Sequence, residues 1–301
     1  MGRWHARELA RAGGSLAAVA DPDPRAGARF PSLTALLDAT PVDVVHVCTP
    51  TDSHEALVGE ALAAGAHVLV EKPLAPDAET TARLLEAARE AGRLLCPVHQ
   101  YLFQPGVLRA PEALRRIGPL VQVDAIACSA GGQGAELDQV ALDILPHALA
   151  VLQRLLPGGL GEVSWSSERP RSGELRAYGQ AGGAGVSVTV SMSGRPPRNE
   201  LRAVCEGGTL ELDFFHGFAH LERGGASRRY KAVRPFSLSL GRAARAGANL
   251  GRRAARREPA YPGLRTLIER FYEAARTDSE GPISADETMA VARARDALAA
   301  R

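Results

Sequence analysis

The chain has little of what would mark several specialised classes of protein. Its four cysteines are widely spaced and form no Cys-x-x-Cys pair, so we expect no zinc site, iron–sulfur cluster or redox dithiol, and no bound metal ion. No apolar run approaches the roughly 18 residues of a membrane helix, and the first residues lack the apolar core of a signal peptide. We therefore expect a reduced, cytoplasmic protein without a membrane partner.

An excess of charge of one sign is also missing. A formal net charge of +2 over 301 residues gives no general reason to expect nucleic acid or a membrane surface as partner. The one basic cluster, from Gly241 to Arg257, has no interleaved aromatic residues and so suits single-stranded nucleic acid poorly. We interpret it as a solvated helical or loop face, with a subunit contact or an anionic ligand such as a phosphate-bearing substrate as the alternatives.

Lysine is scarce. Of 36 basic residues only Lys72 and Lys231 are lysine, whereas arginine is used freely. A lysine ammonium can take part in proton chemistry, while arginine is effectively never deprotonated. Lys72 is therefore a candidate functional residue, with the chance survival of a surface lysine as the alternative.

What is present is an ordinary globular composition, 45% hydrophobic and 23% charged, on a chain long enough for two domains. Up to about residue 100, helical patterns alternate with short β-branched strands, expected at Leu16 to Ala20, Val42 to Cys48 and His67 to Val70. This alternation predicts βαβ winding around a parallel sheet. Later, several short strands separated by glycine and proline predict an antiparallel sheet.

Two segments are expected to end at the same edge of the parallel sheet, where ligands bind in open α/β folds. Thr49-Pro50 follows one strand and leads through His54 into a helix, and Glu71-Lys72-Pro73 closes the next strand. Asp21, after the preceding strand, is placed to accept hydrogen bonds from a dinucleotide ribose, which favours NAD over NADP, although Arg25 nearby softens that choice. A turn-forming aspartate is the alternative for Asp21.

These motifs resemble the family of glucose-fructose oxidoreductase, inositol dehydrogenase and the rhizopine-catabolism dehydrogenase, the Gfo/Idh/MocA family. Matching segments occur in order along nearly the whole chain, namely Val19-Ala-Asp, Val47-Cys-Thr-Pro, Ala64-Gly-Ala-His-Val-Leu-Val-Glu-Lys-Pro, Glu206-Gly-Gly-Thr-Leu-Glu-Leu and Gly281-Pro-Ile-Ser-Ala-Asp-Glu. The resemblance implies a Rossmann-type, doubly wound NAD(P)-binding domain over residues 1–100. An α/β domain over 101–301 would follow, with an open, mainly antiparallel sheet that binds substrate and forms oligomer contacts.

The resemblance also implies the catalytic residues Lys72, Asp143 and His147. Asp143 and His147 lie four apart in a predicted helix and so on one face of it, where the carboxylate can orient or stabilise the imidazole. Alone, such a spacing is more often a surface pair. By the same resemblance the cofactor contacts are Gly2, Asp21, Thr49, Pro50, His54 and Glu71.

Two departures from the family pattern qualify these expectations. Only the last glycine of Gly-x-Gly-x-x-Gly is present, as Gly2, and the first strand and most of the glycine loop are missing. This indicates either a start codon placed downstream of the true one or a real loss of the phosphate-binding part of the cofactor site. Relatives often carry arginine where Leu102 stands, so the substrate pocket has changed. His99, Gln100 and Tyr101 are candidate pocket residues, with a core histidine as an equal interpretation of His99.

The predicted function is an NAD- or NADP-dependent dehydrogenase or ketoreductase that interconverts a secondary alcohol and a ketone on a sugar, cyclitol or similar polyhydroxylated small molecule. His147 is the expected general base, and Lys72 would stabilise charge on the reacting oxygen. A homo-oligomer, a dimer or tetramer, is expected. The alternative is a non-catalytic binding or regulatory relative, motivated by the missing glycine fingerprint.

Overall fold

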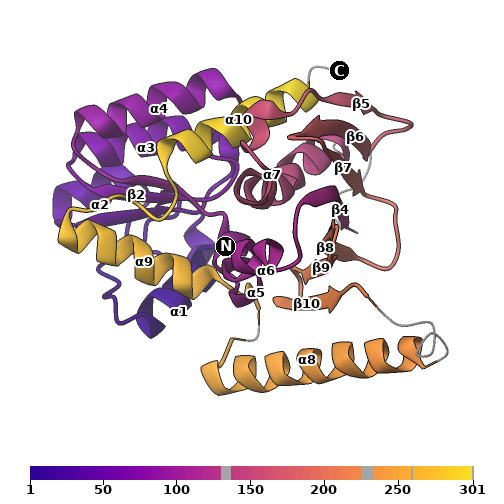
Figure 1. Cartoon of the computed structure of the whole chain (residues 1–301). Coiled ribbons are helices and arrows are strands. Elements are labelled where there is room, and N and C mark those ends of the chain that lie inside the picture. The colour runs from indigo at the N-terminus through magenta and orange to yellow at the C-terminus, as the bar shows by residue number, and fades with distance from the viewer. Residues whose placement is uncertain (130–136, 226–232, 259, 300–301) are drawn as a thin grey trace. The chain divides into compact units, whose positions relative to one another are not determined.

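A computed structural model describes residues 1–129, 137–225, 233–258 and 260–299. The chain divides into two compact units (Figure 1). Unit 1 comprises 1–98 together with 264–293, and unit 2 comprises 99–263 and 294–301. The sequence analysis placed all residues after 100 in the second domain, whereas the structure returns 264–293 to the first unit.

Unit 1 is built on a parallel three-stranded sheet in the order β1-β2-β3. The strands are β1 (Val44–Val47), β2 (His67–Val70) and β3 (Leu95–Pro97). Val44 pairs with His67, and Val68 pairs with Leu95. Apolar β-branched side chains such as Val68 and Val70 are fully buried, as expected for a parallel sheet covered on both faces.

Helices cover this sheet on two sides (Figure 1). On one side lie α3 (His54–Ala63) and α4 (Ala78–Glu90), and on the other lie α1 (Gly2–Arg11) and α9 (Leu264–Thr277). α9 buries Leu267, Ile268 and Phe271, so its apolar face belongs to the core of unit 1. This packing is the reason that a late segment of the chain completes the first unit. The Rossmann-type fold class is confirmed.

One expected strand of unit 1 does not form. Between Leu16 and Ala20 the structure has only an isolated parallel bridge from Ala20 to Phe30. Leu16 is 52% exposed and Val19 is 44% exposed, so neither is buried as a sheet residue would be. A strand requires a partner ladder as well as β-branched residues, and among the described residues this segment has no further one.

Unit 2 is built on a seven-stranded sheet in the order β10-β9-β8-β4-β7-β6-β5. The strands are β4 (Leu120–Cys128), β5 (Ser166–Glu168), β6 (Glu174–Ala181), β7 (Ala184–Ser191), β8 (Arg198–Cys205), β9 (Gly208–Asp213) and β10 (Phe218–Arg223). All neighbouring pairs are antiparallel except β4 and β7, which run parallel. The prediction of a mainly antiparallel sheet is confirmed, although β10 was not anticipated.

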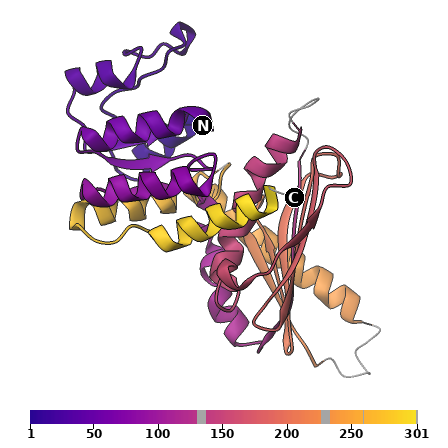
Figure 2. The ribbon, with the colours of Figure 1, turned by 90° about the horizontal axis from the view of Figure 1, so that it is seen from above.

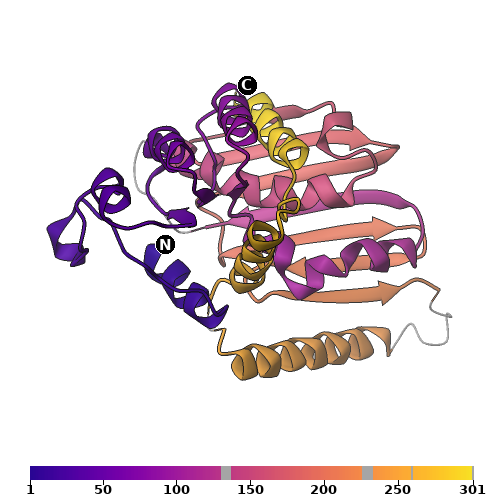
Figure 3. The ribbon, with the colours of Figure 1, turned by 90° about the vertical axis from the view of Figure 1, so that its left-hand side faces the viewer.

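One face of this sheet packs on the long helix α7 (Leu137–Leu155), as the edge-on view in Figure 2 shows. Inward residues of β4 and β7, such as Ala125 and Val188, are buried, while Asp124 and Ser187 on the other face are half-buried. α8 (Arg234–Arg256) lies beside the edge strand β10 (Figure 3). The remaining helices are α2 (Leu33–Ala39), α5 (Pro105–Leu108), α6 (Ala110–Arg115), α10 (Ala285–Ala299) and the 3-10 turns Pro24–Ala26, Thr51–Ser53, Gln100–Phe103 and Leu160–Glu162. No described helix is long and apolar enough to span a bilayer.

Candidate active site

Lys72 stands where the sequence placed it, two residues beyond the carboxyl end of β2. It is half-buried, and it is the only lysine among the residues that the structure describes. Glu71 precedes it, buried, and its backbone N–H donates to Val47 O at 2.9 Å, which joins the ends of β1 and β2. The lysine is thus presented from a segment whose backbone is fixed to the sheet.

A chain of buried polar groups extends from Glu71 into the core of unit 1. Glu71 Oε1 lies 3.0 Å from His5 Nε2, and His5 Nδ1 lies 3.0 Å from His46 Nδ1. His46 Nε2 in turn lies 3.2 Å from the Tyr272 hydroxyl. Four elements, α1, β1, the end of β2 and α9, therefore meet through side-chain hydrogen bonds. This chain of four residues is called the Glu71 relay below.

Protonation in the Glu71 relay is constrained by its surroundings. Burial, and secondarily the neighbouring His5, lower the pKa of His46 to about 3, so its ring stays neutral. Burial raises the pKa of Tyr272 to about 12, so its hydroxyl keeps its proton. The two facing Nδ1 atoms then share one proton, because two bare lone pairs would repel each other. The relay holds Glu71 with every ring nitrogen satisfied.

His54 fixes the neighbouring loops. It is fully buried, and its Nδ1 lies 3.0 Å from Pro73 O while its Nε2 lies 3.0 Å from Thr49 O. The ring therefore joins the loop after β1 to the loop that follows Lys72. Any contribution of His54 to a cofactor site is made through the positions of these two loops, and Thr49 and Pro50 are the exposed residues that they present.

The start of α1 suits an anionic ligand. Gly2 opens this helix, which has no side-chain cap on its first N–H groups. A Cβ built on Gly2 would meet only Cys48 Cβ, at 3.9 Å, so the helix start lies close to the end of β1 with room at its surface. Free N–H groups at a helix start beside the carboxyl edge of a parallel sheet are where dinucleotide phosphates bind. The residues present fit a dinucleotide.

Asp21 lies in the turn that follows the isolated bridge. Its Oδ1 accepts a hydrogen bond from Asp23 N at 2.9 Å, which is the contact of a turn-forming aspartate. Arg25 is paired with Asp23 at 2.8 Å, and this hydrogen bond lowers the pKa of the Asp23 carboxyl. Arg25 is therefore already engaged by a neighbouring carboxylate, which weakens its expected effect on cofactor choice.

In unit 2, Asp143 and His147 both lie on α7, one turn apart as predicted. Asp143 Oδ1 accepts a hydrogen bond from Gln139 Nε2 at 2.9 Å and lies 3.6 Å from the guanidinium of Arg295. Pro146 has no N–H to give to Leu142 O, and Arg295 Nε donates to that carbonyl at 3.4 Å instead. The buried Arg295 therefore supplies the hydrogen bond that Pro146 cannot give to the Leu142 carbonyl. The same guanidinium lies close to the Asp143 carboxylate.

Tyr101 holds the imidazole of His147. The two rings stack with centroids 4.4 Å apart and planes 24° apart, and Phe214 stacks on Tyr101 with its centroid at 5.0 Å. Asn199 Nδ2 donates to the Tyr101 hydroxyl at 3.1 Å. Burial raises the pKa of Tyr101 to about 12, so the phenol is neutral. Tyr101 therefore acts on His147 through its ring face.

His99 and Gln100 are buried beside this stack. Gln100 Oε1 is buried with no hydrogen-bond partner among the described residues, which is unusual for an amide oxygen. Gly263, at φ +96°, packs on the same backbone, because a Cβ there would stand 2.2 Å from Gln100 O. The backbone of this segment is closely packed, and the buried Gln100 amide oxygen is a hydrogen-bond acceptor without a partner among the described residues.

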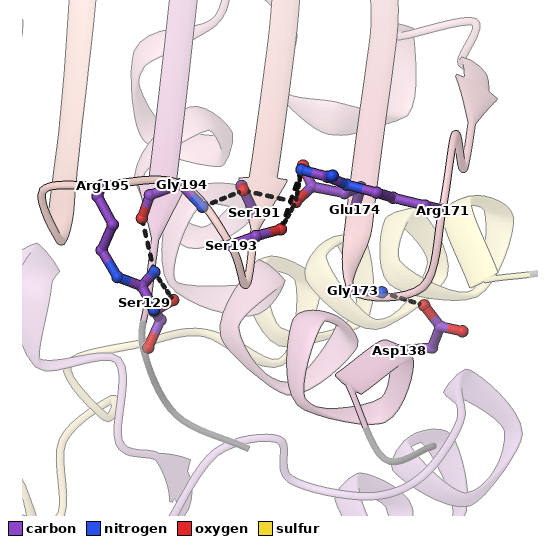
Figure 4. Close-up of polar contacts among 9 residues, drawn as sticks. All are labelled: Ser129, Asp138, Arg171, Gly173, Glu174, Ser191, Ser193, Gly194 and Arg195. Carbon is purple, nitrogen blue, oxygen red and sulfur yellow. Dashed lines mark hydrogen bonds and ion pairs between the residues drawn. The ribbon is translucent and has the colours of Figure 1, made fainter. Parts of the chain in front are cut away.

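A further polar cluster lies where β6 begins and β7 ends, near the start of α7 (Figure 4). Glu174 accepts hydrogen bonds from the hydroxyls of Ser191, at 2.7 Å, and Ser193. Burial pushes the pKa of Glu174 upward, but the two hydroxyls and Arg171 outweigh it and leave the pKa below its usual value. Asp138, on the first turn of α7, accepts from Gly173 N at 2.6 Å. The Asp138 contact anchors the helix that carries Asp143 and His147.

Sequence reasoning missed the supporting residues. His46 carried a usable signal, since a histidine inside a β-branched strand needs a polar partner, whereas His5 lies on α1 and carried none. Tyr272, Arg295 and Asn199 carried none, because their partners lie about 98 to 226 residues away in sequence. Among the described residues, no group of three histidine, cysteine or acidic side chains is arranged to hold a metal ion.

Comparison with known proteins decides the family. Residues 2–99 match the family model described as an oxidoreductase family with an NAD-binding Rossmann fold, GFO_IDH_MocA. The chain is 31% identical over 251 residues to inositol 2-dehydrogenase 4 of Saccharopolyspora erythraea, covering 74% of each chain. The chain belongs to the Gfo/Idh/MocA oxidoreductase family.

Two further proteins extend the comparison. UDP-N-acetylglucosamine 3-dehydrogenase of Acidithiobacillus ferrooxidans is 28% identical over 249 residues, with 75% of each chain covered. The WlbA dehydrogenase of Bordetella pertussis, solved with NADH and UDP-GlcNAcA, superposes with a TM-score of 0.72 at 20% identity, covering 99% of this chain and 93% of that one. The latter likeness shows the fold. The predictions of the family, of an oxidoreductase and of a nicotinamide dinucleotide cofactor are confirmed.

Proposed function

We propose that this Gfo/Idh/MocA protein interconverts a secondary alcohol and a ketone on a sugar, cyclitol or related polyhydroxylated small molecule, with Lys72, Asp143 and His147 as its catalytic residues. The observation that carries the proposal is the position of Lys72, half-buried beyond β2 in the NAD-binding unit of an oxidoreductase family. Two named relatives, an inositol dehydrogenase and a UDP-N-acetylglucosamine dehydrogenase, support the substrate class.

His147 is proposed as the proton acceptor. When the alcohol is oxidised, its hydroxyl proton must go to a base as the carbinol hydride leaves, and a bound nicotinamide supplies the hydride acceptor. The stacked Tyr101 ring restricts the orientation of the imidazole, and Asp143, held by Gln139 and Arg295, adds negative charge one helical turn away. In reduction, His147 returns the proton to the carbonyl oxygen.

Lys72 is proposed to hydrogen-bond the reacting oxygen and to stabilise negative charge on it. A charge-stabilising group is useful only when its position is set before the reaction. The Glu71 relay and the His54 bridge set the backbone on both sides of Lys72, from Glu71 to Leu74. Lys72 is therefore attached to a stretch of backbone that is held on both sides.

The cofactor is proposed to bind at Gly2, Thr49 and Pro50, with Asp21 near the adenosine ribose. Asp21 can accept hydrogen bonds from ribose hydroxyls and would repel a 2′-phosphate, and Arg25 is occupied by Asp23. These features favour NAD over NADP. His54 and Glu71, also predicted as cofactor contacts, serve the site by holding its loops.

The substrate is proposed to meet His99, Gln100 and Tyr101. The unsatisfied Gln100 amide oxygen can accept a hydrogen bond from a sugar hydroxyl. Leu102 is fully buried and offers no cation, which argues against a carboxylate or phosphate held at that position. We further propose that the protein is cytoplasmic and works as a homo-oligomer.

The test begins with cofactor binding. Titration of the chain with NADH, followed by nicotinamide fluorescence, is expected to saturate, and a panel of inositols, hexoses and UDP-sugars with NAD is expected to identify a substrate. Lys72→Ala should then lower kcat roughly 10²–10³-fold and leave the NADH dissociation constant within about threefold. Arg89→Ala, on the exposed face of α4, is the matched control and should change neither quantity. No saturable NADH binding, or full activity in Lys72→Ala, would contradict the proposal.

A further inference from the structure

The helix α8 is oriented opposite to what its sequence leads one to expect. Its arginine side faces the body of unit 2, where Arg242 pairs with Glu211 at 3.2 Å and Arg234 pairs with Glu222. Asn249, the buried residue of the helix, donates to His216 O at 2.6 Å. A helix normally buries its apolar side and exposes its charges. Here the charged side is turned inward.

The outward side of α8 carries a regular apolar seam. Its members follow one another at alternating intervals of four and three residues, and all are exposed: Phe236, Leu240, Ala243, Gly247, Leu250 and Ala254. Phe236 is 76% exposed, and Leu250 is 69% exposed. Figures 1 and 3 show α8 along the edge of the unit 2 sheet with no described element of that unit on its outer side. Intervals of four and three define the seam of a two-helix coiled coil.

The α8 seam matches a reversed copy of itself. When two such helices pair antiparallel about position 245, Phe236 meets Ala254, Leu240 meets Leu250 and Ala243 meets Gly247. Each layer then joins seam residues only, and the largest side chain meets a small one. A parallel pair would instead set Phe236 on Phe236 and glycine on glycine, with crowding at one end and a hole in the middle. The pattern therefore suits a two-fold axis, where the same surface serves both partners.

The charge distribution of α8 argues against nucleic acid or an anionic lipid surface as the occupant of the seam. α8 contains no acidic residue, but five of its arginines are already engaged with Glu211, Glu222, Glu258, Asn249 or the His216 carbonyl. The seam itself is uncharged, so it offers little to nucleic acid or to an anionic lipid surface. A second uncharged seam of the same shape adds no repulsion. The helix is about 34 Å long, which allows contact over several turns.

We infer that α8 is a dimerisation helix, whose outward seam packs antiparallel on α8 of a second copy of this chain. This identifies the Gly241 to Arg257 cluster as part of a subunit contact. It also assigns one two-fold interface to α8. The inference does not depend on the proposed catalytic activity.

The mass of the full chain in solution, measured by light scattering across a concentration series, tests the inference. The wild type is expected as an even-numbered oligomer, and Leu250→Glu should halve its mass by raising the dissociation constant roughly 100-fold, because a carboxylate would enter an apolar layer. Ala248→Glu, on the same helix but off the seam, should leave the mass unchanged. A monomeric wild type, or an unchanged mass in Leu250→Glu, overturns the inference.

Cross-linking tests the direction of pairing without relying on a destabilised variant. Leu240→Cys combined with Leu250→Cys should form an oxidised, covalently linked dimer, whereas Leu240→Cys alone should not, since two copies of position 240 lie ten residues apart along an antiparallel pair. The single variants also control for the native cysteines. Cross-linking by Leu240→Cys alone, or co-sedimentation of the protein with phosphatidylserine vesicles that Leu250→Glu abolishes, overturns the inference.

Discussion

The candidate site residues form two groups, one in each unit, called here the lysine half and the histidine half, and different kinds of interaction hold them. In unit 1, Lys72 follows a backbone fixed by hydrogen bonds among buried polar groups, from Glu71 through His5 and His46 to Tyr272. In unit 2, His147 lies against the ring of Tyr101 on a helix packed in an apolar core. The position of Lys72 therefore depends on the protonation states of hydrogen-bonded groups, and that of His147 depends on side-chain packing. The two halves should therefore fail under different perturbations.

The largest effects should come from the reacting side chains themselves. His147→Ala is expected to lower kcat roughly 10²–10⁴-fold by removing the base, with NADH affinity within about threefold of the wild type. The acidic limb of the pH profile for alcohol oxidation should vanish in His147→Ala and persist in Lys72→Ala, because His147 is the proposed proton acceptor. Steady-state rates across a pH series would reveal this. The same limb in both variants would remove the distinction between the halves.

The next effect should come from the shape of the histidine half. Tyr101→Leu removes the ring from between His147 and Phe214 and is expected to lower the free energy of unfolding by roughly 2–4 kcal/mol and kcat by about tenfold. Tyr101→Phe keeps both ring stacks and loses only the hydrogen bond from Asn199. We expect it to lower the free energy of unfolding by about 1–2 kcal/mol and to leave kcat nearly unchanged. Urea unfolding and kinetics measure both. Equal loss of kcat in the two variants would show that the hydroxyl matters and the stack does not.

The lysine half should respond to acid. His46 has a pKa of about 3 when folded and about 6.5 when unfolded, so below pH 6.5 the unfolded chain binds a proton that the folded chain does not. The free energy of unfolding should fall by about 2–3 kcal/mol between pH 7 and pH 4.5 on this account. The titratable groups that contact His46 are His5 and Tyr272, while Glu71 contacts His5 and Asp43 acts on Tyr272.

His46→Gln removes that titration and should flatten the pH dependence of stability, while lowering stability at pH 7 through lost hydrogen bonds. His220→Gln, in unit 2, is a comparison: burial also lowers the pKa of His220, so this variant should flatten the pH dependence in the same direction, but through a ring outside the Glu71 relay. Denaturant unfolding curves at a series of pH values measure this pH dependence of the free energy of unfolding. An unchanged slope in His46→Gln would remove the claim that protons control this half.

The smallest effect concerns cofactor choice at the edge of unit 1. Asp21→Ala should lower the ratio of kcat/KM for NAD to that for NADP about tenfold, because the repulsion of a 2′-phosphate is lost. Asp38→Ala, an exposed carboxylate on α2, is the control. Kinetics with both cofactors measure the ratio. An unchanged ratio would leave Asp21 as a residue of the turn alone.

Much of the architecture followed from local pattern. The strands β1 and β2 lie within two residues of their expected places, because buried β-branched runs are specified by neighbouring residues. Leu16 to Ala20 shows the limit of that reasoning. It has strand-forming residues, but a strand also needs a neighbour, which local sequence does not supply.

The sequence by itself determined which residues are proposed to carry the chemistry: a lysine after a buried strand, and an aspartate and a histidine one turn apart on one helix. The patterns that identify these residues span only a few neighbouring positions, so periodicity and motifs suffice to find them. Only the tertiary structure decided what holds them. It brought Tyr272 to His46, Arg295 to the carbonyl that Pro146 leaves without its helical partner, and Tyr101 to the face of His147. These contacts join residues far apart in the chain, and packing of whole elements selects them.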